Sequence, residues 1–167
     1  MEKFSELRSI RRKDESAKYF RPKQSEYKRL IESIDSEEKT PVVNFFSKIF
    51  ESKEVAHVFH LQVKGEMGSH AKHTALQEYY DGDVTEILDD LIEMYQGQFG
   101  EIVEGYQIID TTKNAKLDPI QYFTDLAEFI KEERYNCFDE TDTHYFNLID
   151  DLLVIIYKLL YKLKFTK

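Results

Sequence analysis

The chain has 167 residues, of which 41% are hydrophobic and 33% are charged, with six glycines and three prolines. This composition excludes a disordered chain, a collagen-like repeat and a small disulfide scaffold, because enough apolar mass is present to form one buried core. The single cysteine, Cys137, allows no internal disulfide, and no apolar segment is long enough to span a membrane. We therefore expect a cytoplasmic protein with no membrane partner.

The charge is divided unequally between two parts of the chain. Residues 1–34 contain ten of the 23 basic residues and six of the 32 acidic residues, whereas the other 133 residues have a net charge of −13. We predict a basic N-terminal arm over residues 1–35, with a short helix near residues 24–35, and a folded domain over residues 36–167. A basic arm favours DNA or an acidic protein surface as its partner, or else acts as a flexible tail.

The first long helix is predicted to begin at Thr40 and Pro41, because a capping residue followed by proline is typical of a helix start. Apolar residues then recur at steps of three and four as far as Gly65, where the helix is expected to end. These residues define one buried face: Val42, Phe45, Phe46, Ile49, Ala56, Phe59 and Val63.

The second long helix is predicted from the capping candidate Ser69 to about Tyr106, again on apolar spacing. Residues 81–83, with the sequence Asp-Gly-Asp, interrupt this spacing. Glycine weakens a helix, and an α-helix can accommodate one extra residue as a bulge, a single wider turn. We therefore expect a kink or an inserted residue at this point.

Two further helices follow the polar connection 107–117. Asp118 and Pro119 repeat the pattern of cap and proline and predict a third helix to about Tyr135. After a turn at 136–143, a fourth helix begins at about Asp142, with these residues facing inward: Phe146, Ile149, Leu152, Leu153, Ile156, Leu160 and Leu163. Four amphipathic helices predict an all-α fold, a four-helix bundle.

Candidate metal ligands gather where the first two helices meet. Four of the five histidines lie within residues 57–73: His57, His60, His70 and His73. Asp89 and Glu93 follow on the second helix, four residues apart and therefore on one face. Imidazoles and carboxylates together suit iron or another transition metal. The histidines also suit a helix end, where they cap or meet solvent, and the carboxylates suit an ordinary solvated face. A metal site and a purely structural role therefore both stay open.

The order of these residues resembles the DNA-protection-during-starvation (Dps) proteins, a branch of the ferritin-like superfamily. In that family a His-x-x-His motif ends the first helix, a further histidine begins the second, and an Asp-x-x-x-Glu pair follows. His60 falls on the first ligand histidine, and Asp89 and Glu93 fall on the carboxylate pair. His73 falls on the second histidine, with His70 as its competitor.

Two features depart from the family pattern. Leu61 stands where the family has an aromatic residue. The interval from His60 to His73 and the interval from His73 to Asp89 are each one residue longer than usual. A looser resemblance connects the chain with small ferritin-like proteins encoded by bacteriophages.

The Dps resemblance implies a ferritin-like four-helix bundle that binds Fe(II) between two subunits. In such proteins the histidines come from one chain and the carboxylates from its two-fold mate, and the iron is oxidised and stored inside a shell of twelve subunits. The resemblance therefore implies a ferroxidase that forms a homo-oligomer, a dimer at least and a dodecamer in the full shell. We expect the second helix to form the contact, through these small and polar residues: Gly82, Glu86, Asp89, Glu93, Gly97 and Gly100.

Some Dps proteins also bind DNA through a basic arm, which is compatible with residues 1–35. The alternative is a non-enzymatic ferritin-like protein with a degenerate metal site, for example a structural or interaction component of a phage that docks through the arm. Ferrous oxidation by the purified protein distinguishes the two interpretations.

Overall fold

The structure is a computed structural model that describes residues 41–65, 68–100, 102–106 and 116–166. The predicted basic arm and its short helix near 24–35 lie outside the described residues, as does the capping candidate Thr40. Residues 39–167 form one compact unit of the chain, and this unit contains every element described below.

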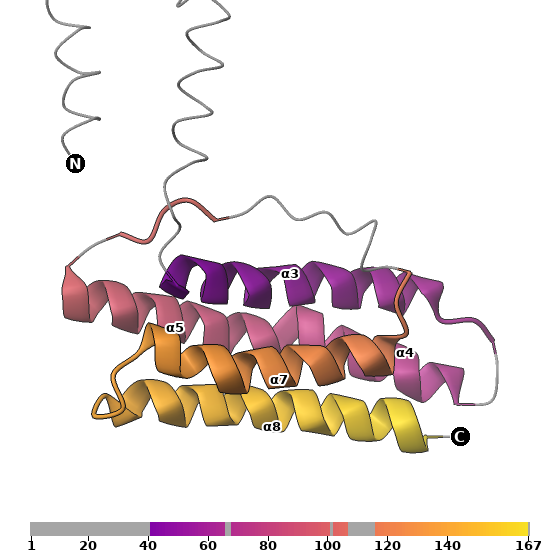
Figure 1. Cartoon of the computed structure of the whole chain (residues 1–167). Helices are drawn as coiled ribbons and strands as arrows, with labels where there is room; N and C mark the ends of the chain where they lie inside the picture. The colour runs from indigo at the N-terminus through magenta and orange to yellow at the C-terminus, as the bar shows by residue number, and fades with distance from the viewer. Residues whose placement is uncertain (1–40, 66–67, 101, 107–115, 167) are drawn as a thin grey trace, which may run out of the picture. The chain divides into compact units, whose positions relative to one another are not determined.

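Four long helices pack together, as the sequence predicts (Figure 1). The elements in chain order are α3 (Pro41–Gln62), α4 (Ser69–Glu78), the π-helical segment η1 (Tyr79–Asp83), α5 (Val84–Phe99), α7 (Pro119–Cys137) and α8 (Thr143–Phe165). Because α4, η1 and α5 run on without a break, they correspond to the second predicted helix. Helix α3 packs on α7 and on the α4–α5 helix, and α8 packs on the same two neighbours, which gives a bundle.

The helix starts follow local sequence signals at two of the predicted sites. Pro41 is the first residue of α3, and the Asp118 side chain accepts a hydrogen bond of 3.0 Å from the backbone N–H of Gln121 at the start of α7. The prediction for α4 was wrong by one residue. Gly68 occupies the capping position with φ of +87°, a left-handed conformation that favours glycine, and Ser69 is the first helical residue.

The second helix ends earlier than its apolar spacing predicts. Helix α5 stops at Phe99, not near Tyr106, because Gly100 adopts φ of +67° and donates its N–H to the carbonyl oxygen of Gln96. The Gln96 side chain then accepts a hydrogen bond of 3.0 Å from the backbone N–H of Val103. A left-handed glycine thus overrides an apolar pattern that continues past it.

The interruption predicted at residues 81–83 is a π-helical turn over Tyr79–Asp83. From Leu76 onward, successive buried residues of this helix are three or four positions apart, except between Tyr79 and Val84, where the step is five. A π turn accommodates one extra residue without rotating the helix that follows. Of the two predicted alternatives, a kink and an inserted residue, the structure has the inserted residue, which keeps Leu88 and Leu91 in the core.

The core is rich in aromatic rings contributed by α3, η1, α7 and α8. Phe123 of α7 lies 5.1 Å from Tyr79 and 6.3 Å from Phe59, measured between ring centroids, and all three side chains are buried. The residues that the sequence analysis places on the buried faces of the first and fourth helices are buried, except Val63 and Phe146. These two are partly exposed at the edge of the core. No helix within the described ranges combines the length and apolarity needed to cross a membrane.

Cys137 at the end of α7 is partly buried, and its thiol is expected to react slowly. Burial, together with the negative charge of Glu133, raises the pKa of Cys137 to about 12. Because the thiolate is the nucleophile, iodoacetamide should modify the folded protein about 100-fold more slowly than the protein unfolded in guanidinium chloride at about pH 8. Mass spectrometry measures both rates. The folded rate should increase as the pH is raised, and equal rates for the two states would contradict this expectation.

Candidate functional site

His60 and His73 form a closely packed pair where α3 ends and α4 begins. Their rings are stacked with centroids 3.6 Å apart and an interplanar angle of 27°. The Nδ1 atom of His60 lies 3.0 Å from the carbonyl oxygen of His73, and the Nδ1 atom of His73 lies 3.3 Å from the carbonyl oxygen of His60. Each imidazole is therefore held by the backbone of the other residue.

These two hydrogen bonds determine the tautomer of both rings. A carbonyl oxygen can only accept, so the proton of each bond must be on Nδ1. In the neutral imidazole, Nε2 then carries a lone pair and is the atom available to a metal ion or a proton. His60 is 9% exposed, so its ring has little freedom to change orientation.

A tyrosine and a third histidine surround this pair. The Tyr80 ring stacks on His57 with centroids 4.5 Å apart and lies 5.4 Å from His60 in an edge-on arrangement. The sequence interpretation overlooked Tyr80, although it lies seven residues after His73 and therefore on the same helical face. Tyr80 belongs to the π-helical turn, so the inserted residue helps to position this aromatic side chain.

The structure selects between the two histidines that competed for the second ligand position. His73 is partly buried and contacts His60, whereas His70 is exposed. Both residues lie in the first turns of α4, three positions apart, and packing of α4 against α3 brings only His73 to the pair.

Asp89 and Glu93 lie on the exposed face of α5, one turn apart. In the part of the chain that the structure describes, no group of three or more histidine, cysteine, aspartate or glutamate side chains is arranged to hold a metal ion. The structure therefore brings His60 and His73 together and does not add Asp89 or Glu93 to them within one chain.

The face of α5 belongs to a strongly acidic segment. Residues 73–112 contain ten aspartates and glutamates and no lysine or arginine. Glu86, Asp89, Asp90 and Glu93 are exposed along α5, and none of them forms an ion pair with another described residue. Such a surface attracts cations and repels nucleic acid.

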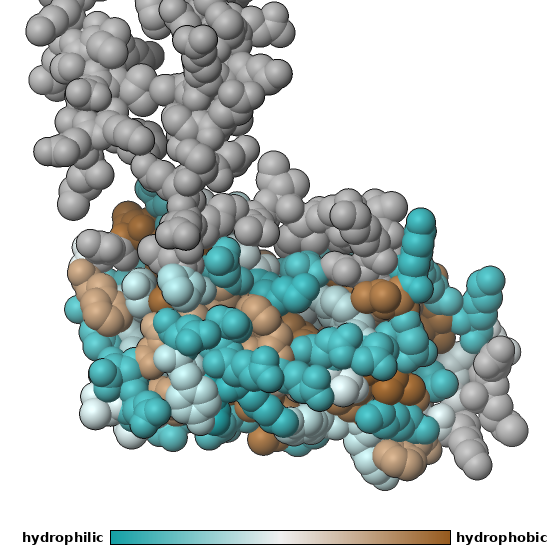
Figure 2. Space-filling view, in the orientation of Figure 1, coloured by the Kyte–Doolittle hydropathy of each residue, from teal (hydrophilic) through white to brown (hydrophobic). Residues whose placement is uncertain are grey.

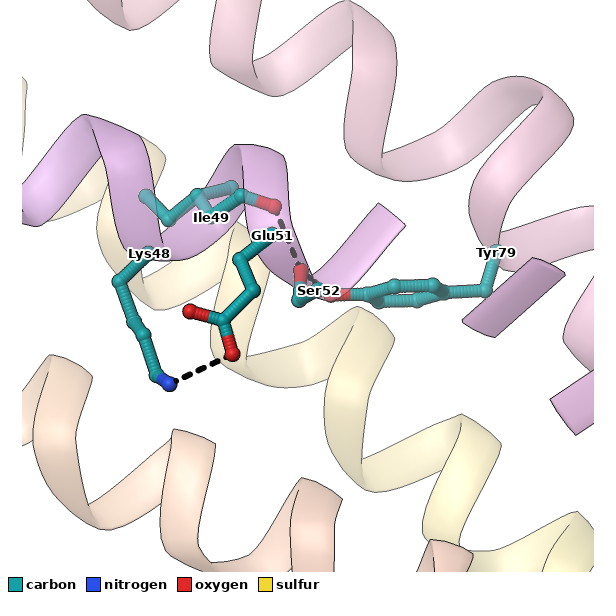
Figure 3. A network of polar contacts seen from close by, with 5 residues as sticks. All are labelled: Lys48, Ile49, Glu51, Ser52 and Tyr79. Atoms are coloured by element: carbon teal, nitrogen blue, oxygen red, sulfur yellow. Dashed lines mark hydrogen bonds and ion pairs between the residues drawn. The ribbon is translucent and has the colours of Figure 1, made fainter. Parts of the chain in front are cut away.

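A buried polar pair connects α3 with the π-helical turn (Figure 3). The Ser52 hydroxyl lies 2.7 Å from the Tyr79 hydroxyl and donates a hydrogen bond of 2.7 Å to the carbonyl oxygen of Ile49. Because the single hydroxyl proton of Ser52 is used in that bond, Tyr79 is the donor to Ser52. Burial raises the pKa of Tyr79 well above its ordinary value, so Tyr79 remains a donor at neutral pH. Ser52 interrupts an apolar face, which is the sequence signal for this pair.

The histidine pair can act in two ways. The Nδ1–H of His73 donates to the carbonyl oxygen of His60 in the last turn of α3, and the Nδ1–H of His60 donates to the carbonyl oxygen of His73 in α4, so the pair caps α3 and joins two helices. Its Nε2 atoms are the kind of donor that transition metals bind, and a backbone carbonyl on the other ring nitrogen is the usual support of a metal-binding histidine. The hydrogen bonds of the pair show the capping role, whereas metal binding requires ligands in addition to the two histidines.

Comparisons with known proteins identify one family. A model of a family of unknown function (DUF5856) matches residues 60–163. Neither a curated protein nor a solved structure matches the chain. The matched range begins at His60 and includes α4, η1, α5, α7 and most of α8. Because this range covers more than half of the chain, the protein belongs to the DUF5856 family.

Proposed function

We propose that this protein binds ferrous iron through His60 and His73, with Asp89 and Glu93 of a second copy completing the site. Hydrogen peroxide is the oxidant we propose: one molecule takes one electron from each of two ferrous ions and two protons, which gives two ferric ions and two waters. The observation that supports this function best is the reciprocal hydrogen bonding of His60 and His73. These bonds require the proton of each ring on Nδ1, so each Nε2 atom has a lone pair that can bind a metal ion. Two imidazoles and two carboxylates form a donor set that suits iron.

The participation of a second copy rests on where the carboxylates lie. Asp89 and Glu93 are exposed and have no cation partner among the described residues, so another molecule can reach them. A divalent cation between them and the histidines would relieve the repulsion of two neighbouring carboxylates. Since both ligand types bind metal only when deprotonated, iron affinity is expected to fall on acidification.

Asparagine substitutions test the metal role separately from the capping role. The amide nitrogen of asparagine is attached at the same position as Nδ1 and can donate the same hydrogen bond, but asparagine has no atom in place of Nε2. We expect His60→Asn and His73→Asn to retain the helical circular dichroism of the wild type. Each variant should oxidise ferrous iron at least about tenfold more slowly than the wild type, as measured by absorbance. A rate that does not differ from the buffer rate in the wild type would refute the iron proposal.

Mixing two inactive variants tests whether the ligands come from different copies. His60→Asn retains its carboxylates, and Asp89→Asn with Glu93→Gln retains its histidines. A dimer that contains one copy of each has one intact site of two, so an equal mixture should recover about a quarter of the wild-type oxidation rate. No recovery would exclude a site shared between copies, and each variant alone is the control.

A non-enzymatic interaction protein is the second candidate function. It is favoured by the exposed apolar residues of α8 and by the capping role of the histidine pair, which needs no metal. Association with DNA through the basic arm remains a prediction about residues outside the described ranges. The acidic face of α5 makes the arm, not the bundle, the part of this chain suited to phosphates.

A further inference from the structure

Tyr80 is an oxidisable side chain that lies against the histidine pair. Its ring lies 5.4 Å from the His60 ring in an edge-on arrangement and stacks on His57 at 4.5 Å, measured between ring centroids. Of the rings that contact His60 among the described residues, two are imidazoles and the third is this phenol, which gives up an electron more readily. The chain contains no tryptophan, so tyrosine is its most easily oxidised aromatic residue. Tyr80 is therefore placed to supply an electron to a reaction at the histidine pair.

The preceding tyrosine, Tyr79, is directed to a different environment. Its ring is buried against Phe123, and its hydroxyl lies 2.7 Å from the Ser52 hydroxyl. Tyr80 is only half-buried, and its ring faces the histidines. Successive residues of a helix point in different directions, so the π-helical turn places one tyrosine in the core and the next at the candidate site. The two phenols are therefore not interchangeable.

The electron balance of the proposed iron reaction creates a need for such a donor. The two imidazoles and two carboxylates of one site form a single donor set and hold one ferrous ion. That ion supplies one electron, whereas the reduction of hydrogen peroxide to two waters takes two. If the second electron is missing, the products are hydroxide and a hydroxyl radical, which attacks the protein. A second ferrous ion can supply this electron, but the other site of a dimer is empty when iron is scarce.

We propose that Tyr80 supplies the second electron when only one ferrous ion is bound, an inference that rests on the proposed iron function. One ferrous ion, the Tyr80 phenol, one hydrogen peroxide and one proton from solvent then give one ferric ion, a Tyr80 phenoxyl radical and two waters. The O–O bond of the peroxide and the O–H bond of the phenol break, and the phenolic proton goes to a peroxide oxygen. The ferrous ion and the phenol each lose one electron.

The Tyr80 radical returns to the phenol when more iron arrives. A further ferrous ion gives it one electron and solvent gives it one proton, which produces a second ferric ion. The sum is two ferrous ions for each hydrogen peroxide, the same stoichiometry as the reaction with two bound ions. Tyr80 therefore stores one oxidising equivalent at the site and keeps it from leaving as a hydroxyl radical.

Electron paramagnetic resonance of the full chain tests this role of Tyr80. The protein receives fewer ferrous ions than there are copies, hydrogen peroxide is added, and the sample is frozen. We expect a tyrosyl radical signal in the wild type and its loss in Tyr80→Phe, which keeps the ring but has no hydroxyl group. An excess of ferrous iron should remove the wild-type signal. A spin trap should detect more hydroxyl radical from Tyr80→Phe than from the wild type at low iron.

Tyr157→Phe is the matched control and should give the wild-type radical signal. Tyr157 is 43% exposed on α8, and its ring lies 5.2 Å from the Nζ atom of Lys131. The molecular face in Figure 2 is largely hydrophilic, with hydrophobic side chains in small patches, so the loss of one hydroxyl group should not change solubility.

The outcomes separate the Tyr80 proposal from the iron function. A wild type that oxidises iron without a tyrosyl radical, or a Tyr80→Phe protein with as strong a signal as the control, would overturn the role of Tyr80 and leave the iron function standing. A wild type that oxidises iron no faster than buffer would overturn both.

Discussion

Replacement of Phe123 by alanine is expected to lower the free energy of unfolding by about 3–5 kcal/mol, because it removes a fully buried ring and leaves a cavity. Phe123 contacts Phe59 of α3 and Tyr79 of η1 from its position on α7, so the cavity would separate three elements of the bundle. Urea denaturation followed by circular dichroism measures the change, at one fixed protein concentration because self-association also alters the apparent stability.

Phe99 provides the matched control for Phe123. It has the same side chain but is 51% exposed at the end of α5. Phe99→Ala should therefore cost about 1 kcal/mol or less, since little apolar surface returns to water. Equal losses for the two variants would mean that the ring contacts around Phe123 do not form the stabilising core described above.

Deletion of Gly82 is expected to leave the bundle folded, although it removes a residue from the middle of a helix. The π turn contains one residue more than a regular helix needs, so this deletion restores an unbroken α-helix with Val84, Leu88 and Leu91 still in the core. The loss of stability should be about 1 kcal/mol or less, because a glycine also leaves the helix interior. Thermal unfolding monitored by circular dichroism gives the measurement.

Deletion of Asp90 is the corresponding control, because Asp90 is exposed and its side chain contributes little to the core. Removing it rotates part of α5 by about 100°, so either Leu91 or the pair Val84 and Leu88 must leave the core. The expected cost is about 3 kcal/mol or more. If both deletions have similar effects, the interpretation of η1 as an accommodated insertion is wrong.

The sequence by itself determined the number of helices, the starts of α3 and α7, most of the buried residues and the position of an irregularity near Gly82. These features depend on local causes: proline and capping residues begin helices, the period of 3.6 residues marks the buried faces, and a glycine between two aspartates weakens a helix. The choice of an inserted residue over a kink required the structure, because it depends on the burial of Tyr79. The end of α5 could not be predicted from apolar spacing, because a left-handed Gly100 stops the helix while apolar residues continue.

Only the tertiary structure decided how the candidate site is composed. His70 and His73 are equivalent by spacing, and the choice of His73 depends on how α4 packs against α3, which involves residues far apart in sequence. The same packing brings Tyr80 to His57 and His60, and it leaves Asp89 and Glu93 on an exposed face away from the histidines of their own chain. Spacing along a helix determines which side chains share a face, whereas the contact between faces depends on the energy of the whole packed core.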